Sequence, residues 1–163
     1  MKKSIKKLFR QNILFTIIIL GAFAHRHYQN TNTAKIAKNR NLSNISVYSM
    51  ERKSEIKLKD LTFHDKTIYL WATWCPPCRI QNQIIDLYET LGIIDNDKLI
   101  KISVDQNKQA LKKYLKDEKQ ENHFIETTNL FFNERIIRGT PSMIKVDQDG
   151  FVEEVKTGIN LLW

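Results

Sequence analysis

One stretch constrains the chain more than any other, because it holds the only two cysteines. Cys75 and Cys78 stand two residues apart in a Trp-Cys-Pro-Pro-Cys motif. An apolar run typical of a buried β-strand, residues 67–71, comes directly before the motif, and a helical pattern follows it. A thiol at a helix N-terminus meets unpaired backbone N–H groups and the positive end of the helix dipole, which lower its pKa from ~8.5 to roughly 3.5–7.5. The sequence therefore predicts a redox-active pair.

The positions within the motif predict different roles for its residues. Cys75 is expected to be the nucleophile, and Cys78, one helical turn further on, the resolving thiol that attacks the mixed disulfide. Pro76 suits the first helical turn, where a missing N–H costs nothing, and Pro77 stiffens the loop. Trp74 is expected to form an exposed platform beside the nucleophile.

Zinc is the main alternative for this cysteine pair. A structural zinc site needs four ligands, and one Cys-x-x-Cys supplies two of them. The histidines are scattered along the chain and do not provide a second half-site: His25, His27, His64 and His123. Redox chemistry is the favoured interpretation, with no resident metal or other cofactor.

Composition places the positive charge at one end of the chain. The 163 residues carry a formal net charge of +8 and are 42% hydrophobic, enough for one core plus an appendage. Residues 1–60 hold 13 basic and 3 acidic side chains, which leaves 13 basic and 15 acidic ones for the remainder. The predicted globular part thus has no nucleic-acid-binding footprint, and nucleic acid is not an expected partner.

The N-terminal segment has the features of an export signal. Residues 1–12 are rich in lysine, and residues 13–24 are almost wholly apolar. A signal-peptide core needs about 7–15 apolar residues, whereas a membrane span needs ~20. Residues 1–24 are therefore interpreted as a cleaved signal peptide, with an uncleaved membrane anchor as the alternative. Residues 25–44 are expected to form a polar, basic linker, and residues 45–163 one domain, exported in either case.

The rest of the chain reads as an α/β pattern. Strands are expected at residues 67–71, 99–104, 124–127, 142–146 and 151–155, and residues 45–63 suggest an irregular strand or hairpin. Helices are expected after Cys78 and over 108–119 and 129–137. The first helix is predicted to pack on the sheet through five apolar side chains: Ile80, Ile84, Leu87, Tyr88 and Leu91. Asp105 follows a strand, where ending that strand and starting a helix is a more ordinary role than proton transfer.

A second motif supports a family resemblance. Leu-Trp-Ala-Thr precedes the Trp-Cys-Pro-Pro-Cys-Arg run, and Gly139-Thr140-Pro141 follows about sixty residues later. With these motifs, residues 54–158 resemble the thioredoxin superfamily, and more narrowly the exported TlpA/ResA-like thiol-disulfide oxidoreductases. The resemblance implies a thioredoxin-like fold, a central mixed sheet flanked by helices, with an N-terminal hairpin extension and a short or missing C-terminal helix. It also implies a cis peptide bond before Pro141, with Thr140 and Pro141 contacting the substrate.

Two departures from the family pattern concern proton transfer. Thioredoxins place a buried aspartate six residues before the first cysteine, where this chain has Tyr69. The exported relatives usually lack that aspartate too, but they often carry a glutamate and a proline soon after the second cysteine. This chain has Ile-Gln-Asn-Gln over residues 80–83 instead. Glutamate-assisted proton transfer near the dithiol is therefore not expected.

The expected activity follows from the motifs and the resemblance together. The chain is interpreted as a periplasmic or cell-envelope enzyme that reduces disulfides of exported proteins, with apocytochrome c among the substrates that the family suggests. Such a reductase needs a membrane electron donor, because the sequence has no glycine motif for nicotinamide or flavin. The alternatives are a disulfide oxidase or isomerase of the same fold and a non-enzymatic copper or zinc chaperone. A thiol peroxidase fits the motif less well.

Overall fold

The computed structural model describes residues 16–22, 24–25, 28, 35, 37–61, 66–115 and 123–161. Internal contacts divide the chain into two units, residues 1–32 and 33–163. In the first unit, residues 16–22 are helical and exposed. No helix among the described residues is both long and apolar enough to cross a membrane. The basic start of the predicted leader, its residue Phe23, and the predicted helical residues 116–119 lie outside the described part.

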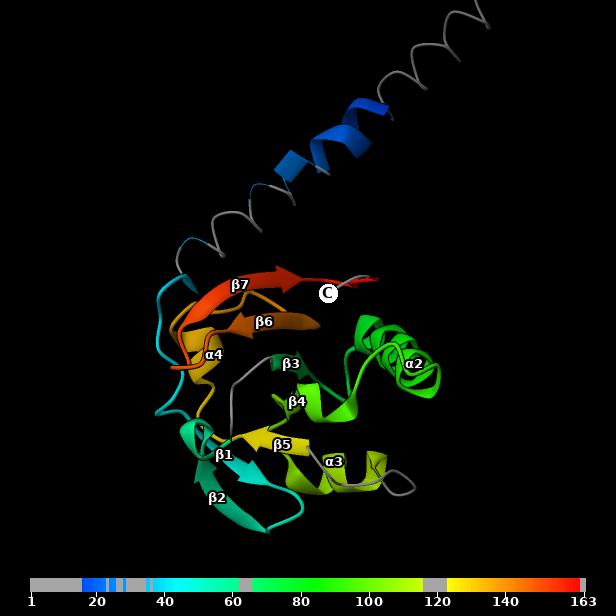
Figure 1. Cartoon of the computed structure of the whole chain (residues 1–163). Helices are drawn as coiled ribbons and strands as arrows, with labels where there is room; N and C mark the ends of the chain where they lie inside the picture. The colour runs from blue at the N-terminus through cyan, green and yellow to red at the C-terminus, as the bar shows by residue number, and fades with distance from the viewer. Residues whose placement is uncertain are drawn as a thin grey trace, which may run out of the picture. The chain divides into compact units, whose positions relative to one another are not determined.

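The second unit is built on one mixed sheet of seven strands, in the order β2-β1-β5-β4-β3-β6-β7 (Figure 1). Strands β3, β4 and β5 run parallel, and the other neighbouring pairs are antiparallel. This arrangement confirms the predicted α/β class. The strands are β1 Ser46–Ser49, β2 Ser54–Lys57, β3 Thr67–Trp71, β4 Leu99–Ser103, β5 His123–Glu126, β6 Ser142–Val146 and β7 Val152–Thr157.

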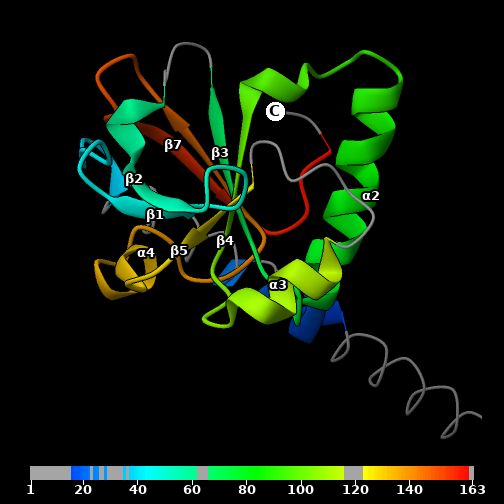
Figure 2. The same cartoon turned by 90° about the horizontal axis from the view of Figure 1, so that it is seen from below.

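Two helices cover one face of this sheet. Helix α2 (Pro76–Thr90) joins β3 to β4, and α3 (Lys108–Tyr114) joins β4 to β5. Because both right-handed crossovers move across the sheet in the same direction, both helices lie on the same face. The short α4 (Leu130–Asn133) lies on the other (Figures 1 and 2). The described residues also form two 3-10 turns, η1 (Leu58–Asp60) and η2 (Asn96–Lys98).

Helix α4 is shorter than the predicted helix over 129–137. Asn129 directly before it has φ 54°, and Arg135 soon after it has φ 57°. These left-handed conformations cannot continue a right-handed helix, so they bound it on both sides. Asn107, rather than Asp105, caps the start of α3, because its side chain accepts the N–H groups of Gln109 and Ala110.

The predicted hairpin before the motif is confirmed by β1 and β2, which pair antiparallel. The residues just before it correct another prediction. Ala37 and Leu42 are fully buried, and the Asn39 N–H donates to the carbonyl of Val152 at 3.1 Å. The last part of the predicted linker, residues 37–44, therefore belongs to the folded unit. Its backbone finds partners on the β6–β7 side, which residue-by-residue polarity does not reveal.

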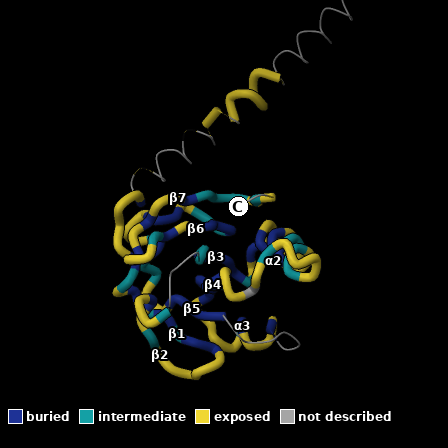
Figure 3. Tube along the Cα trace, in the orientation of Figure 1, coloured by how far each residue is buried: buried dark blue, intermediate teal, exposed yellow. Residues whose placement is uncertain are grey.

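The orientation of α2 also differs from the prediction. Cys78, Gln81 and Ile85 are its buried residues. The predicted core positions Ile80, Leu87 and Leu91 are 50%, 54% and 62% exposed, and Ile84 and Tyr88 are half-buried. The physical reason lies at the start of the helix: once Cys78 is placed inward, positions three and seven residues further on face the sheet. Figure 3 shows the central strands mostly buried and exposed residues along α2.

After β7, the described residues 158–161 form no helix. They are nevertheless bound at several points. The Gly158 N–H donates to the carbonyl of Pro141 at 2.8 Å, and the hydroxyl of Tyr88 donates to the carbonyl of Leu161 at 2.7 Å. We call residues 158–161 the strap, because it connects the Thr140-Pro141 loop with α2.

Candidate active site

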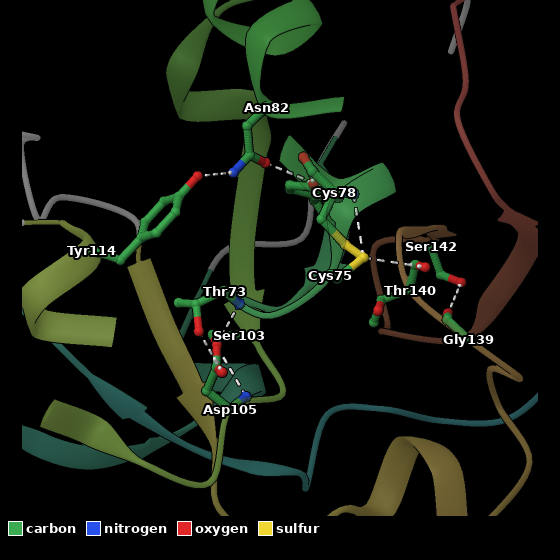
Figure 4. The surroundings of a disulfide bond; sticks show 11 residues. Thr73, Cys75, Cys78, Asn82, Ser103, Asp105, Tyr114, Gly139, Thr140 and Ser142 are labelled. Carbon is green, nitrogen blue, oxygen red and sulfur yellow. Dashed lines mark hydrogen bonds between the residues drawn. A yellow bond between two sulfur atoms is a disulfide. The ribbon is translucent and has the colours of Figure 1, made fainter. Parts of the chain in front are cut away.

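The two cysteines lie where β3 passes into α2, at the carboxyl end of a central parallel strand. Cys75 has extended backbone angles (φ −96°, ψ 106°) and is the N-cap of α2, and Pro76 begins the helix. The two sulfurs form a disulfide, with Cα atoms 5.2 Å apart (Figure 4). The sulfur of Cys75 accepts the backbone N–H of Cys78 at 3.2 Å. A thiolate at this atom would thus receive a hydrogen bond from the helix N-terminus.

A second loop faces the sulfur of Cys75. The Thr140–Pro141 peptide bond is cis, as the resemblance implied. The carbonyl oxygen of Thr140 lies 3.5 Å from the Cys75 sulfur. The hydroxyl of Ser142 donates to the carbonyl of Gly139 at 2.7 Å (Figure 4). It also lies 2.9 Å from the hydroxyl of Thr157. These bonds hold the loop against β7, so two residues 65 apart in sequence meet at the dithiol.

The exposed surface around the disulfide is provided by its neighbours. Cys75 is 3% exposed and Cys78 is fully buried, so Cys75 is the outer sulfur. Trp74 is 65% exposed, and Pro76 and Pro77 are exposed as well. Trp74 therefore lies where the sequence predicted an exposed platform, directly before the outer cysteine.

Behind the disulfide lies a hydrogen-bond chain that the sequence did not reveal. The hydroxyl of Tyr69 donates to the side-chain oxygen of Asn82 at 2.7 Å and lies 3.4 Å from the carbonyl oxygen of Cys78. The amide of Asn82 donates to the hydroxyl of Tyr114 at 3.3 Å (Figure 4). Burial, with smaller contributions from Tyr114 and Asp86, raises the pKa of Tyr69 well above its usual value. Tyr69 is thus a neutral hydrogen-bond donor, unlike the aspartate of thioredoxins.

His123, Lys101 and Glu89 form a further group of polar side chains, which we call the polar layer. The imidazole of His123 packs edge-on against the indole of Trp71, with ring centroids 6.1 Å apart. Burial and the neighbouring Lys101 lower the pKa of His123 to about 4, so the ring is neutral at physiological pH. Lys101 pairs with Glu89 of α2 at 3.0 Å. Within the described part of the chain, no three His, Cys, Asp or Glu side chains gather as a metal site.

Two further groups beside the motif make contacts that the sequence did not predict. Asp105 is 3% exposed and binds Thr73, two residues before the nucleophile. Gln81 is fully buried and exchanges two hydrogen bonds with the backbone of Asn160, at 3.1 Å and 2.7 Å. A carboxylate at the end of a strand next to the motif was a usable signal for the first group. The second joins residues 79 apart and has no local signal.

No protein-family model matches the sequence. Solved structures do match it. One is a putative thiol:disulfide interchange protein DsbE from Chlorobium tepidum, with 21% identity and a TM-score of 0.54, covering 76% of this chain and 86% of that chain. A putative thiol-disulfide oxidoreductase from Bacteroides vulgatus has 27% identity and a TM-score of 0.52, covering 71% and 77%.

An exposed lipoprotein thioredoxin from Streptococcus pneumoniae matches with 17% identity and a TM-score of 0.52, covering 71% of this chain and 89% of that chain. Likenesses at this identity show the thioredoxin-like fold. The same fold here carries a Cys-x-x-Cys at the start of α2 and a cis-proline loop opposite it. By fold and by the placement of its dithiol, the chain is similar to solved thiol-disulfide interchange proteins and oxidoreductases of the thioredoxin-like fold.

Proposed function

We propose that the protein is an exported thiol-disulfide oxidoreductase that reduces disulfides of other exported proteins through Cys75 and Cys78. The observation that carries the proposal is the N-cap position of Cys75, whose sulfur accepts the Cys78 N–H while facing the carbonyl of Thr140. The first contact stabilises a thiolate, and the second lies on a loop that can align an extended peptide. The similar structures are described as thiol-disulfide interchange proteins and oxidoreductases, which agrees with this chemistry.

The reaction balances as two exchange steps. The thiolate of Cys75 attacks one sulfur of the substrate disulfide, which forms a mixed disulfide and releases the other substrate sulfur as a thiolate. The thiolate of Cys78 then attacks the Cys75 sulfur, which releases the second substrate thiolate and leaves the Cys75–Cys78 disulfide. Water protonates both substrate thiolates. Two electrons pass to the substrate, so a dithiol donor must reduce the protein again.

Export and the membrane donor are part of the same proposal. The basic start and apolar run of residues 1–24 are typical of a secretory signal or anchor. The similar protein from Streptococcus pneumoniae is described as an exposed lipoprotein. Because the donor must deliver two electrons outside the cytoplasm, a membrane dithiol protein is the proposed partner. Trp74, Pro76 and Pro77 are the proposed substrate contacts on the motif side, with Thr140 and Pro141 opposite.

The test is the reduction potential of the Cys75/Cys78 pair, measured on the purified full chain by equilibration with glutathione or thioredoxin buffers. A potential near or below that of thioredoxin, about −270 mV, supports a reductase. A potential near about −120 mV, the value for strong oxidants, would replace this direction with oxidase or isomerase activity. The absence of any reversible disulfide, with stoichiometric binding of copper(I) or zinc, would replace the enzyme with a metal chaperone.

Matched cysteine variants test the two roles. Cys75→Ser is expected to reduce a disulfide substrate no faster than buffer, because the attacking sulfur is gone. Cys78→Ser is expected to accumulate a mixed disulfide between Cys75 and the substrate, visible by mass spectrometry, because nothing resolves it. If Cys78→Ser blocks the first attack and Cys75→Ser traps the substrate, the assignment of the two roles is reversed.

A further inference from the structure

Asp105 is a buried carboxylate that the exchange reaction itself does not use. It follows β4 and is 3% exposed, beside the turn that leads to Cys75 (Figure 4). Oδ2 accepts the backbone N–H of Thr73 at 2.8 Å and the hydroxyl of Ser103 at 2.6 Å. Oδ1 accepts the hydroxyl of Thr73 at 2.8 Å. Both carboxylate oxygens are thus bound by neighbouring groups, as a buried carboxylate requires.

The sheet explains why Asp105 meets this turn. Trp71 and Ser103 are register partners on the parallel strands β3 and β4, and the Val104 N–H still donates to the Trp71 carbonyl at 2.9 Å. The two strands therefore end at the same level of the sheet. Thr73 and Asp105, each two residues after these partners, lie side by side. Thr73 sits in the middle of the turn, whose ends are closed by a bond from the Cys75 N–H to the Ala72 carbonyl at 3.3 Å.

We propose that Asp105 is a positioning residue for thiol-disulfide exchange: by fixing Thr73 it keeps Trp74 and the Cys75 sulfur in place at the N-terminus of α2. This inference rests on the proposed function. Thr73 is bound through both its backbone and its side chain, so the turn is held in position and in orientation. Misplacing a reacting group by about 1 Å can cost on the order of a hundredfold in rate.

A direct electrostatic role is the competing account, and it predicts the opposite sign. If the charge of Asp105 acted on the dithiol, removing that charge would make the Cys75 thiolate easier to form. If Asp105 acts by position, losing it displaces Cys75 from the helix N-terminus and makes the thiolate harder to form.

Two substitutions separate these accounts in the full chain. Asp105→Asn removes the charge but can keep the geometry, because its amide oxygen can accept the Thr73 N–H and its amide nitrogen can donate to the Thr73 hydroxyl. Asp105→Ala removes every bond. The measurements are the Cys75 pKa from thiolate absorbance, kcat and KM for a disulfide peptide, and hydrogen exchange at the Thr73 amide.

For Asp105→Ala we expect a Cys75 pKa higher by about one unit, kcat/KM at least about tenfold lower, and much faster exchange at the Thr73 amide. For Asp105→Asn we expect kcat/KM within about twofold of the original and an unchanged Cys75 pKa. A lowered Cys75 pKa in both variants would overturn the proposal in favour of a charge effect. Unchanged behaviour of Asp105→Ala would overturn it outright.

A second pair of variants serves if Asp105→Ala fails to fold. Thr73→Val removes one of the two bonds, and Thr73→Ser retains the hydroxyl. The proposal expects a partial loss of kcat/KM in Thr73→Val and recovery in Thr73→Ser, and equal behaviour of the two contradicts it. The pKa and amide-exchange measurements need no substrate. If the unmodified protein does not catalyse thiol-disulfide exchange, the proposed function fails. The pKa and hydrogen-exchange measurements still decide whether Asp105 positions Cys75.

Discussion

The two faces of α2 reverse the usual pattern of a surface helix, which buries apolar side chains and exposes polar ones. The face toward the sheet carries Cys78 and Gln81 along with Ile85, all at most 1% exposed. The face toward solvent carries Ile80, Leu87 and Leu91, each at least half exposed. Hydrophobic periodicity alone selects the second face as the core. The comparison teaches that the requirement to bury Cys78 beside Cys75 sets the rotation of this helix.

The polar residues of the inner face replace apolar packing with specific bonds. Gln81 is held on the strap by the backbone of Asn160, and Asn82 is held on the sheet by Tyr69. A buried side-chain amide without hydrogen-bond partners would lower the stability of the fold. An amide whose donors and acceptors are all paired favours one arrangement of the helix. The inner face therefore fixes α2 against both the sheet and the strap.

The sharpest test of this comparison is a matched pair of apolar deletions. Ile85→Ala should lower the free energy of unfolding by about 2–4 kcal/mol, because it leaves a cavity between α2 and the sheet. Leu87→Ala, two residues away on the outer face, should change it by about 0.5 kcal/mol or less. Urea unfolding of the two variants measures both values. Equal losses would mean that the outer face is also buried in the protein in solution.

Titration of His123 tests the polar layer under the inner face. Its pKa is about 4 in the folded protein, against ~6.5 in an unfolded chain. Since the unfolded state binds the proton first, the free energy of unfolding should fall as the pH drops from about 6.5 to 4, by about 3 kcal/mol at most. Unfolding measured across this range should show the loss.

His123→Phe is the control for this titration. It removes the histidine and leaves every carboxyl group in place, including Glu126, whose pKa burial raises and whose effect on stability therefore has the opposite sign. The pH dependence that disappears in the variant belongs to His123. An unchanged slope would show that the ring is accessible to protons in the folded state.

The smallest expected effect concerns the strap. Gln81→Leu keeps the size of the side chain but leaves the N–H and carbonyl of Asn160 without their partner, which should cost about 1–3 kcal/mol. Hydrogen exchange at the Asn160 amide should accelerate in parallel. Gln83→Leu, an exposed position on the same helix, is the matched control and should leave both quantities unchanged. A stabilised Gln81→Leu variant would show that the pair contributes specificity without stability.

Much of the fold could be predicted because its signals are local. The strands Thr67–Trp71 and Ser142–Val146 were predicted to the residue, since each is a short apolar run bounded by polar or turn residues. The mixed sheet and the cis bond before Pro141 came from the resemblance and are confirmed by the structure. The placement of Cys75 at the start of a helix followed from the motif alone.

The rest depends on contacts between distant residues. Asp105 finds Thr73 across 32 residues, and Gln81 finds Asn160 across 79. Polar residues such as these have no periodicity that distinguishes a buried, paired side chain from a solvated one. The rotation of α2 was predicted wrongly because hydrophobic periodicity alone was used, whereas the inward position of Cys78 turns Gln81 and Ile85 toward the sheet.

The pairing of residues 39–40 with the beginning of β7 has a consequence for the edges of the sheet. An uncovered edge strand offers free N–H and carbonyl groups to other chains and promotes aggregation. At one end of the sheet, β2 is short and carries Glu55 and Lys57, which discourage such pairing. At the other, the Val152 N–H donates to the carbonyl of Arg40 at 2.9 Å. A shortened protein that begins at Ile45 would lose these backbone bonds and leave the start of β7 open to pairing with another chain.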